Sequence, residues 1–451
     1  MNFLYLKEKA FEALENKRYH MLKQILQDMN PADLAVIFSE LDKNDIYIVF
    51  RLLPKELSAE TFSYMDSEMQ KHLIDIFSDK ELSEVIDQLY IDDTVDLVEE
   101  MPANVVSRIL KNADTETRKM INEMLKYPND SAGSIMTVEY TYLHKDMTVR
   151  QSIEKIRSIG CVKETVYTCY VTDARKLIGF VTVLDLLTSD DDMHISEIMD
   201  TNVITVNTYD HRESVAKQFS KYDFVAMPVV DNDNRLVGIV TFDDVMDVIE
   251  EEATEDFEKM AGMSHSDDDY FKMSVFDHVK HRLFWLIFLL LFSTITGLIT
   301  DHFRSQLISM PVLISFICTI MCTGGNCGSQ SATMIIRGMS LDEIKLKDFF
   351  KVIFKEFRVG LICGVVLSIV NAVRIFLIYN SLPLAIVVSL ALILIVIVSK
   401  LVGCVLPMIA KRINIDPTTM SGPMMSTFLD ASSMLIYLLI TSSLLTNVNI
   451  S

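Results

Sequence analysis

The sequence predicts a multidomain membrane protein: an all-α superhelical domain, an α/β domain built from two similar halves, a connecting helix and an all-α domain of five spans. Three observations predict this. The chain has 451 residues, 50% of them hydrophobic, and apolar stretches of spanning length begin only after residue 280. Residues 1–279 carry 55 Asp and Glu against 28 Lys and Arg, whereas residues 280–451 carry 7 against 13. Within residues 133–250 a strand-rich pattern occurs twice.

Residues 1–132 are expected to form the helical domain, because apolar residues recur there at three- and four-residue spacing. Pro31, Pro54 and Pro102 each stand where a short helix is predicted to start. Their separations of 23 and 48 residues fit one short period, which predicts a superhelical stack of small helical hairpins.

The halves of the second domain are expected at 133–196 and 197–250. Ser134–Thr137 has a counterpart in Glu197–Asp200, and the stretch from Leu177 to Asp185 matches Leu236 to Asp244. Each half predicts a helix, a strand, a turn, a second strand and then a helix opened by Thr and Asp. This pattern resembles a pair of CBS modules, the type named after cystathionine β-synthase.

The repeated Thr and Asp have two interpretations. In CBS modules such residues often hold the phosphate and ribose of a nucleotide, which makes ATP a candidate ligand here. Alternatively, the Thr side chains cap their helices and the Asp side chains occupy the first turn. The residues concerned are Thr182, Asp185, Thr241 and Asp244.

The segment 251–279 is expected to be a connecting helix with a strongly acidic start. A charge run is usually a solvated face, but like charges at three- and four-residue spacing destabilise their own helix. A divalent cation would relieve that repulsion, and without one the acidic domains should separate. The carboxylates crowded here are Asp243, Asp244, Asp247, Glu250, Glu251, Glu252, Glu255, Asp256 and Glu258.

Residues 280–451 predict five spans, near 283–300, 310–336, 359–379, 384–410 and 421–446. Basic residues gather before the first span, between the second and third, and after the fourth. The positive-inside rule therefore predicts a cytoplasmic N-terminus and an outside C-terminus in a plasma (inner) membrane. The basic residues inside the spans, Arg374 and Lys400, are expected to extend to an interface.

Asp430 is the one charged residue between Pro423 and Leu445. A carboxylate in hydrocarbon costs about 2.5–3.5 kcal/mol on insertion scales, so it usually faces water or a partner. It is either a buried Asp bonded to neighbouring helices or a site for a hydrated cation. The second span is interrupted by the polar run Thr323–Thr333, and two prolines predict a broken entry to the fifth. These two spans are therefore expected to line one path, although close packing of small residues could also account for the glycines.

Several function classes are disfavoured. The acidic balance argues against nucleic acid and favours cations as partners. The N-terminus lacks an apolar core of signal-peptide length, and the seven cysteines follow no metal-ligand spacing. No nucleophile–base pair supports an enzyme. A cation-coupled exchanger and a membrane-bound nucleotide sensor remain as alternatives to a channel.

The whole chain resembles the MgtE-type magnesium channels. The polar run Gly324–Thr333 resembles that family's GGNxGNQSAT, the stretch Asp416–Pro423 followed by Asp430 resembles its DP…SNP…D, and Asp247–Asp256 resembles its acidic connecting helix. The order of the domains makes the resemblance specific. It implies a homodimer in a lipid bilayer, with a pore on the two-fold axis that conducts hydrated Mg²⁺.

The resemblance also implies residue roles. Asp430 would face the ion with polar help from Asn326 and Thr333, and Mg²⁺ bound to cytoplasmic carboxylates would hold a plug helix near residues 258–278 against the pore. Two departures concern the pore: Ser329 and Gly422 stand where the family usually has Asn. The implied sensing residues are Asp92, Asp96, Glu213, Asp223, Asp244, Asp247, Glu252, Glu255 and Asp256.

Overall fold

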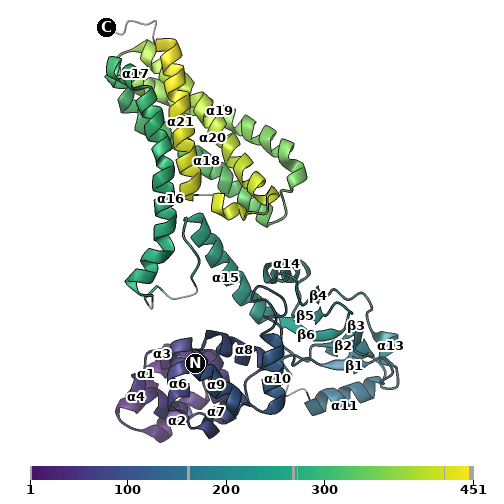
Figure 1. The fold of residues 1–451 in the computed structure, drawn as a ribbon. Coiled ribbons are helices and arrows are strands. Elements are labelled where there is room, and N and C mark those ends of the chain that lie inside the picture. Colours follow the sequence, from purple (N-terminus) through teal and green to yellow (C-terminus); the bar gives the residue numbers. More distant parts are fainter. Residues whose placement is uncertain (1–2, 160–162, 267–269, 272, 421, 446–451) are drawn as a thin grey trace. The chain divides into compact units, whose positions relative to one another are not determined.

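The computed structural model describes residues 3–159, 163–266, 270–271, 273–420 and 422–445. The chain divides at Glu250 into two units, each with its own internal packing (Figure 1). The first unit holds a helical domain and two small sheets, and the second holds the long apolar helices.

Ten short helices build the first domain, as the apolar spacing predicts. Alternate helices pack together, α3 on α5, α5 on α7 and α7 on α9, which is the arrangement of a stack. Pro31 is in the first turn of α3, whereas Pro54 and Pro102 lie one residue before α5 and α9. The helices are α1 (Phe3–Glu15), α2 (Tyr19–Gln27), α3 (Pro31–Ser39), α4 (Lys43–Phe50), α5 (Lys55–Ser63), α6 (Ser67–Ile76), α7 (Asp79–Ile86), α8 (Ile91–Glu100), α9 (Ala103–Asn112) and α10 (Thr115–Met124).

The duplicated pattern folds into two three-stranded sheets, ordered β1-β2-β3 and β4-β5-β6. In each sheet the first pair of strands is parallel and the second antiparallel. The short first strands were not predicted. The elements are β1 (Tyr142–His144), α11 (Val149–Ile159), β2 (Thr168–Asp173), β3 (Lys176–Thr182), α12 (Val183–Thr188), α13 (Ile195–Ile198), β4 (Val206–Asn207), α14 (Arg212–Tyr222), β5 (Ala226–Val230) and β6 (Leu236–Thr241).

The matching segment at the start of each half pairs with a strand of the other half. Thr137, in the first half, forms paired backbone hydrogen bonds with Ile239 on β6, at 2.8 and 2.9 Å. Asp200, in the second half, pairs in the same way with Phe180 on β3, at 3.0 Å in both directions. The two halves therefore complete one another, and this accounts for the repeated motif in structural terms.

The helix predicted near 258–278 is not continuous through the described residues of that range. The acidic helix α15 (Phe242–Met260) starts in the last CBS motif and ends at Met260, and α16 begins only at Val275. Gly262 has a positive φ of 70°, and the Met263 and Gly262 amides donate to the Glu258 and Lys259 carbonyls at 2.9 and 3.0 Å. This is a Schellman ending, which a glycine at that position favours. None of the described residues between 261 and 274 is helical.

Five helices of the second unit are long and apolar enough to cross a membrane, which confirms the predicted number. Among them α20 packs against α18, α19 and α21, and α16 lies along α21 (Figure 1). The polar run Thr323–Thr333 lies within α18, which is continuous through it. The helices are α16 (Val275–His302), α17 (Arg304–Ser309), α18 (Ile314–Ser340), α19 (Phe349–Tyr379), α20 (Leu382–Arg412) and α21 (Gly422–Leu445), and the short 3₁₀ turn η4 (Pro417–Met420) supplies the broken entry to the fifth span.

Candidate functional site

Asp430 lies on α21 opposite a glycine of α18. A Cβ built on Gly325 would stand 3.9 Å from the Asp430 Oδ1 atom and 3.9 Å from the Ser426 Oγ atom. The Asp430 side chain is only partly buried. Within the described residues it has neither a hydrogen-bond nor an ion-pair partner. A carboxylate in a membrane span without a protein partner is free to face water or a hydrated ion.

The residues of the polar run occupy two faces of α18, one exposed and one packed against the neighbouring helices. Asn326 and Thr333 are exposed and Ser329 is half-buried, so a polar stripe faces away from the neighbouring helices. The glycines face inward, where a Cβ on Gly403 of α20 would meet the Gly328 backbone. Close packing through small residues, one of the two interpretations of this run, therefore holds for the inner face only.

Lys400 does not extend to an interface, so that expectation is wrong. Its side chain is 6% exposed, and Nζ donates to the Ser331 Oγ atom at 3.3 Å. The Ser331 hydroxyl donates in turn to the Glu356 Oε2 atom at 2.7 Å. A charged chain thus joins α20, α18 and α19 inside the membrane domain. Arg374 is exposed and donates to Asn371 at 2.8 Å.

In the first unit, an acidic cluster forms between the helical domain and the CBS pair. It joins Asp92, Asp93 and Asp96 on α8 with carboxylates of the CBS pair, and these groups repel one another electrostatically. An Oδ1 atom of Asp92 and an Oε2 atom of Glu164 are buried without a hydrogen-bond partner in the described structure. We call the following set the acidic cluster: Asp92, Asp93, Asp96, Glu139, Glu164, Asp243, Asp244 and Asp247.

Burial and mutual repulsion raise the pKa values of five carboxyls in this cluster, those of Asp92, Asp93, Asp96, Glu164 and Asp244. Burial is the larger cause, followed by repulsion from neighbouring carboxylates. The pKa rises to about 6 for Asp93 and Asp244, to about 7 for Asp96 and to about 8 for Glu164. The pKa of Asp92 is also well above the usual carboxyl range. Such groups bind protons more readily than ordinary carboxyls, and a nearby cation would favour their charged forms.

The structure brings four of the predicted sensing residues into this cluster, namely Asp92, Asp96, Asp244 and Asp247. Glu213 and Asp223 lie on α14 instead, where Glu213 pairs with Lys217 at 2.7 Å and Asp223 ends the helix at a positive φ of 55°. Their sensing role remains a prediction.

Glu139 and Glu164 were not selected from the sequence. Each stands alone in an irregular segment, and only the fold carries it to α8. Across the described chain, no three His, Cys, Asp or Glu side chains converge closely enough to ligate one ion directly. Mg²⁺ usually keeps several of its waters, so an outer-shell site needs carboxylates nearby but not direct convergence.

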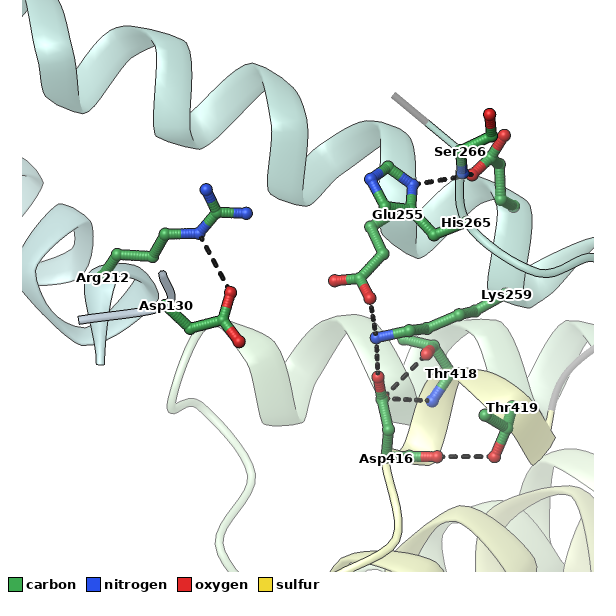
Figure 2. Close-up of polar contacts among 10 residues, drawn as sticks. Asp130, Arg212, Glu255, Lys259, His265, Ser266, Asp416, Thr418 and Thr419 are labelled. Carbon is green, nitrogen blue, oxygen red and sulfur yellow. Dashed lines mark hydrogen bonds and ion pairs between the residues drawn. The ribbon is translucent and has the colours of Figure 1, made fainter. Parts of the chain in front are cut away.

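The second unit contains an ion-paired contact at the C-terminal end of α15. Figure 2 shows the Lys259 ammonium between two carboxylates, 2.8 Å from Glu255 Oε1 and 2.8 Å from Asp416 Oδ2. The other Asp416 oxygen accepts from the Thr418 amide and hydroxyl at 2.9 and 2.7 Å. Glu255, a predicted sensing residue, thus holds the lysine that binds the entry to α21. Glu252 and Asp256 lie on the same helix.

Charge pairing dominates the electrostatics of this contact. Burial alone lowers the pKa of Lys259, but hydrogen bonds to Asp416 and Glu255 outweigh it and raise that pKa above the ordinary value. Burial raises the pKa of Asp416, but the Lys259 ammonium and Thr418 outweigh it and lower that pKa. Both groups are therefore charged at neutral pH.

Backbone contact accompanies the ion pair. Gly422 has a positive φ of 46°, and a Cβ there would overlap the Met260 carbonyl oxygen. Gly422, which departs from the family pattern, is thus the residue that lets the end of α15 approach α21. A larger residue such as Asn would have to move this contact apart.

The two Thr–Asp pairs lie at the starts of their own helices. At the start of α12 the Asp185 amide donates to the Thr182 hydroxyl oxygen at 3.1 Å, and the Thr182 amide donates to the Asp185 carboxylate at 2.9 Å. At the start of α15 the Thr241 amide donates to the Asp244 carboxylate at 3.3 Å, and the Thr241 hydroxyl donates to the same oxygen. The capping interpretation thus accounts for Thr182 and Asp185, and nucleotide binding would have to use the same groups.

Models of known protein families match each part of the chain. The family model described as a divalent cation transporter matches residues 317–440, the MgtE intracellular N domain matches 29–130, and CBS domains match 132–191 and 195–251. The magnesium transporter MgtE of Thermus thermophilus is 35% identical, covering 96% of this chain and 97% of its own. That of Bacillus subtilis is 29% identical, covering 94% of both chains.

Solved structures agree. The cytosolic domain of the Mg²⁺ channel MgtE in complex with ATP is 34% identical with a TM-score of 0.52, covering 54% of this chain and 99% of that one. The soluble part of a magnesium transporter is 29% identical with a TM-score of 0.53, covering 56% of this chain and 100% of that one. The helical domain, the CBS pair and the five apolar helices thus occur in the order found in its relatives, and the chain belongs to the MgtE family of magnesium transporters.

Proposed function

We propose that the protein is a homodimeric, Mg²⁺-selective channel that mediates Mg²⁺ uptake across the plasma membrane and closes when cytoplasmic Mg²⁺ is abundant. One observation carries the proposal: the Asp430 carboxylate has no protein partner in the described structure and lies opposite Gly325, within the polar run of α18. Mg²⁺ loses its waters reluctantly and is usually held through them by one or two carboxylates. Asp430 from each of two subunits would supply that charge without a dehydrating cage.

The homodimer is supported by the faces that one chain leaves uncovered. Asn326 and Thr333 are polar, exposed and within a membrane span, where lipid is a poor environment for them. A second copy related by a two-fold axis would place the same stripe opposite itself and enclose a water-filled path. Helix α16, which has no buried residue, supplies further apolar surface for lipid or for the partner subunit.

Closure by cytoplasmic Mg²⁺ is supported by the acidic cluster and by the ion-paired end of α15. Mg²⁺ near Asp92, Asp244 and Glu164 would offset their repulsion and favour the arrangement in which the helical domain contacts the CBS pair. A ligand shifts a conformational equilibrium only by its difference in affinity for the two states. The acidic cluster supplies that difference, because its carboxylates gather only in the closed arrangement.

ATP is proposed as a second ligand, at the CBS pair. The support is the solved cytosolic domain of a Mg²⁺ channel MgtE, which was crystallised with ATP.

The charge distribution supports the proposed orientation in the membrane, because Lys411 and Arg412 at the end of α20 and the lysines before α19 would face the cytoplasm. The C-terminus would then lie outside.

The test is electrical recording from membrane patches that expose the cytoplasmic face. Current should be carried by Mg²⁺ when Mn²⁺, Co²⁺ and Ni²⁺ are compared, should ignore imposed sodium and proton gradients, and should fall as cytoplasmic Mg²⁺ rises. Dependence on a second gradient would instead identify an exchanger. ATP binding without ion flux would identify a nucleotide sensor.

Closure has its own test in a triple variant, Glu252→Gln, Glu255→Gln and Asp256→Asn. We expect its current to persist at cytoplasmic Mg²⁺ that closes the unmodified channel. The matched control removes three exposed charges from α1 (Glu8→Gln, Glu12→Gln and Glu15→Gln) and should close normally. Unchanged closure in the first variant would mean that the acidic residues of α15 form only a solvated surface and have no role in closure.

A further inference from the structure

Two cysteines lie one turn apart on the exposed side of α18. The Cys318 and Cys322 Sγ atoms are 3.9 Å apart, and both side chains are exposed. The other membrane-domain cysteines differ: Cys327 and Cys404 are buried, and Cys363 on α19 is half-buried. Packing therefore accounts for Cys327 and Cys404 but not for the exposed pair.

The pair continues the polar stripe of α18. Cys318, Cys322 and Asn326 follow one another at four-residue spacing, which places them on one side of the helix. Gly325, three residues after Cys322, faces the Asp430 carboxylate. In the proposed topology the N-terminal end of α18 is the outer end, so the two thiols lie between the outside and Asp430.

The separation of the sulfurs matches a metal chelate. With a metal–sulfur bond of about 2.3 Å and a tetrahedral angle, two thiolates on one ion stand about 3.8 Å apart. The Cys318 and Cys322 sulfurs need to move by only about 0.1 Å from their 3.9 Å separation to reach it. Thiolates select soft ions, whereas Mg²⁺ prefers oxygen.

We propose that Cys318 and Cys322 bind a thiophilic divalent cation, of the Cd²⁺ and Zn²⁺ class, on the outer approach to Asp430. Each thiol loses its proton to solvent, two metal–sulfur bonds form, and two of the ion's waters leave while others complete its coordination. No third His, Cys, Asp or Glu ligand is close by within the described part of the chain. The bound ion is therefore exchangeable and obstructs the path that Mg²⁺ would follow. The obstruction rests on the proposed function, whereas the binding does not.

Binding is tested on the purified full-length protein, reduced and free of metal. Titration with Cd²⁺ should produce the ultraviolet thiolate-to-metal absorption with one ion per chain. Cys318→Ser and Cys322→Ser should each weaken this binding by at least about tenfold, equivalent to ~1.4 kcal/mol. Cys363→Ser, the control from the same domain, should leave it unchanged. Equal absorption in the double variant Cys318→Ser/Cys322→Ser would overturn the site.

Obstruction is tested by Mg²⁺ flux into vesicles with Cd²⁺ added outside. Flux should fall in the unmodified protein and in Cys363→Ser, recover when a chelator is added, and resist at least about tenfold more Cd²⁺ in the double variant. Absorption without any loss of flux would overturn the placement of the pair on the path. If the protein carried no Mg²⁺ at all, the proposed function would fail while the absorption still decided whether the thiols bind metal.

Discussion

Lys259 and Asp416 form an ion pair that joins the acidic helix α15 to the entry of α21. The two side chains are 26% and 36% exposed, so solvent weakens the pair, but Lys259 also contacts Glu255 and both partners lie beside the Met260–Gly422 backbone contact. The lysine thus provides a fixed positive charge between carboxylates at the point where closure is proposed to act.

Lys259→Gln should weaken closure. Losing the ammonium leaves Glu255 and Asp416 near one another without a counter-charge, so the closed arrangement loses about 0.5–1 kcal/mol for a partly exposed pair. Patch recordings should show closure at roughly two- to fivefold higher cytoplasmic Mg²⁺. Lys280→Gln, at an exposed site on α16, is the control. Closure at an unchanged concentration would mean that the Lys259 bridge does not contribute.

Lys400 makes a different kind of contact, because it is buried inside the membrane domain. Lys400→Met should lower the stability of that domain by about 1.5–3 kcal/mol, the range for a hydrogen bond to a charged group, since Ser331 and Glu356 then lose the ammonium at the end of their hydrogen-bonded chain. Arg374→Met, which removes an exposed basic residue of a span, should have a smaller effect. Thermal unfolding in detergent measures both. An equal loss in the two variants would contradict the chain from Lys400 to Glu356.

At the scale of elements, helix α8 contains three aspartates that repel neighbouring carboxylates in the first unit. Its three aspartates have pKa values above the ordinary carboxyl range, which means that folding favours their protonated forms. The stability that they contribute is present below pH of about 4 and is lost as the pH rises through their folded values of about 6 and 7.

Hydrogen exchange of the α8 amides in the full-length protein should show the same loss of stability with rising pH. Without divalent cations, protection of α8 should fall as the pH rises from about 5 to about 8, while α3 changes little. Mg²⁺ should restore protection, and more strongly at high pH, because protons and the cation compete for the same carboxylates. Protection that rises with pH in metal-free buffer would contradict the raised pKa values.

The spacing of apolar residues and the positions of proline and glycine predicted the type and order of nearly all elements, including the five apolar helices. They missed β1 and β4, whose three and two residues are too short to show alternation. They left open whether the glycines of α18 line a path or allow close packing, and the tight contacts of Gly324 and Gly328 with α20 and α21 decide for packing on that side of the helix. The end of α15 was missed because Gly262 stops the helix while the charge pattern continues beyond it.

The candidate site was predictable where a residue is unusual for its surroundings. Asp430 is conspicuous because it is a charge within an apolar span. Glu139 and Glu164 are not, since exposed loops commonly contain carboxylates and only tertiary packing brings these two, half-buried, near α8. The interhelical contact of Lys400 was missed for a related reason: its partners, Ser331 and Glu356, lie on other helices.

At the scale of the whole molecule, the acidic soluble region and the apolar domain have separate tasks. The first would sense Mg²⁺ through clustered carboxylates, and the second would conduct it past Asp430. Both tasks use the same chemistry, in which carboxylates hold a hydrated ion without stripping its waters. The cytoplasmic carboxylates would differ from Asp430 in being able to approach or separate.

The most direct test of this account is Mg²⁺ uptake by vesicles containing Asp430→Asn, which keeps the shape of the side chain and removes its charge. We expect uptake to fall by at least about tenfold while the dimer and the thermal unfolding temperature are retained, since little else contacts this carboxylate. Asp301→Asn, at the exposed end of α16, should transport normally. Undiminished uptake by Asp430→Asn would contradict the account.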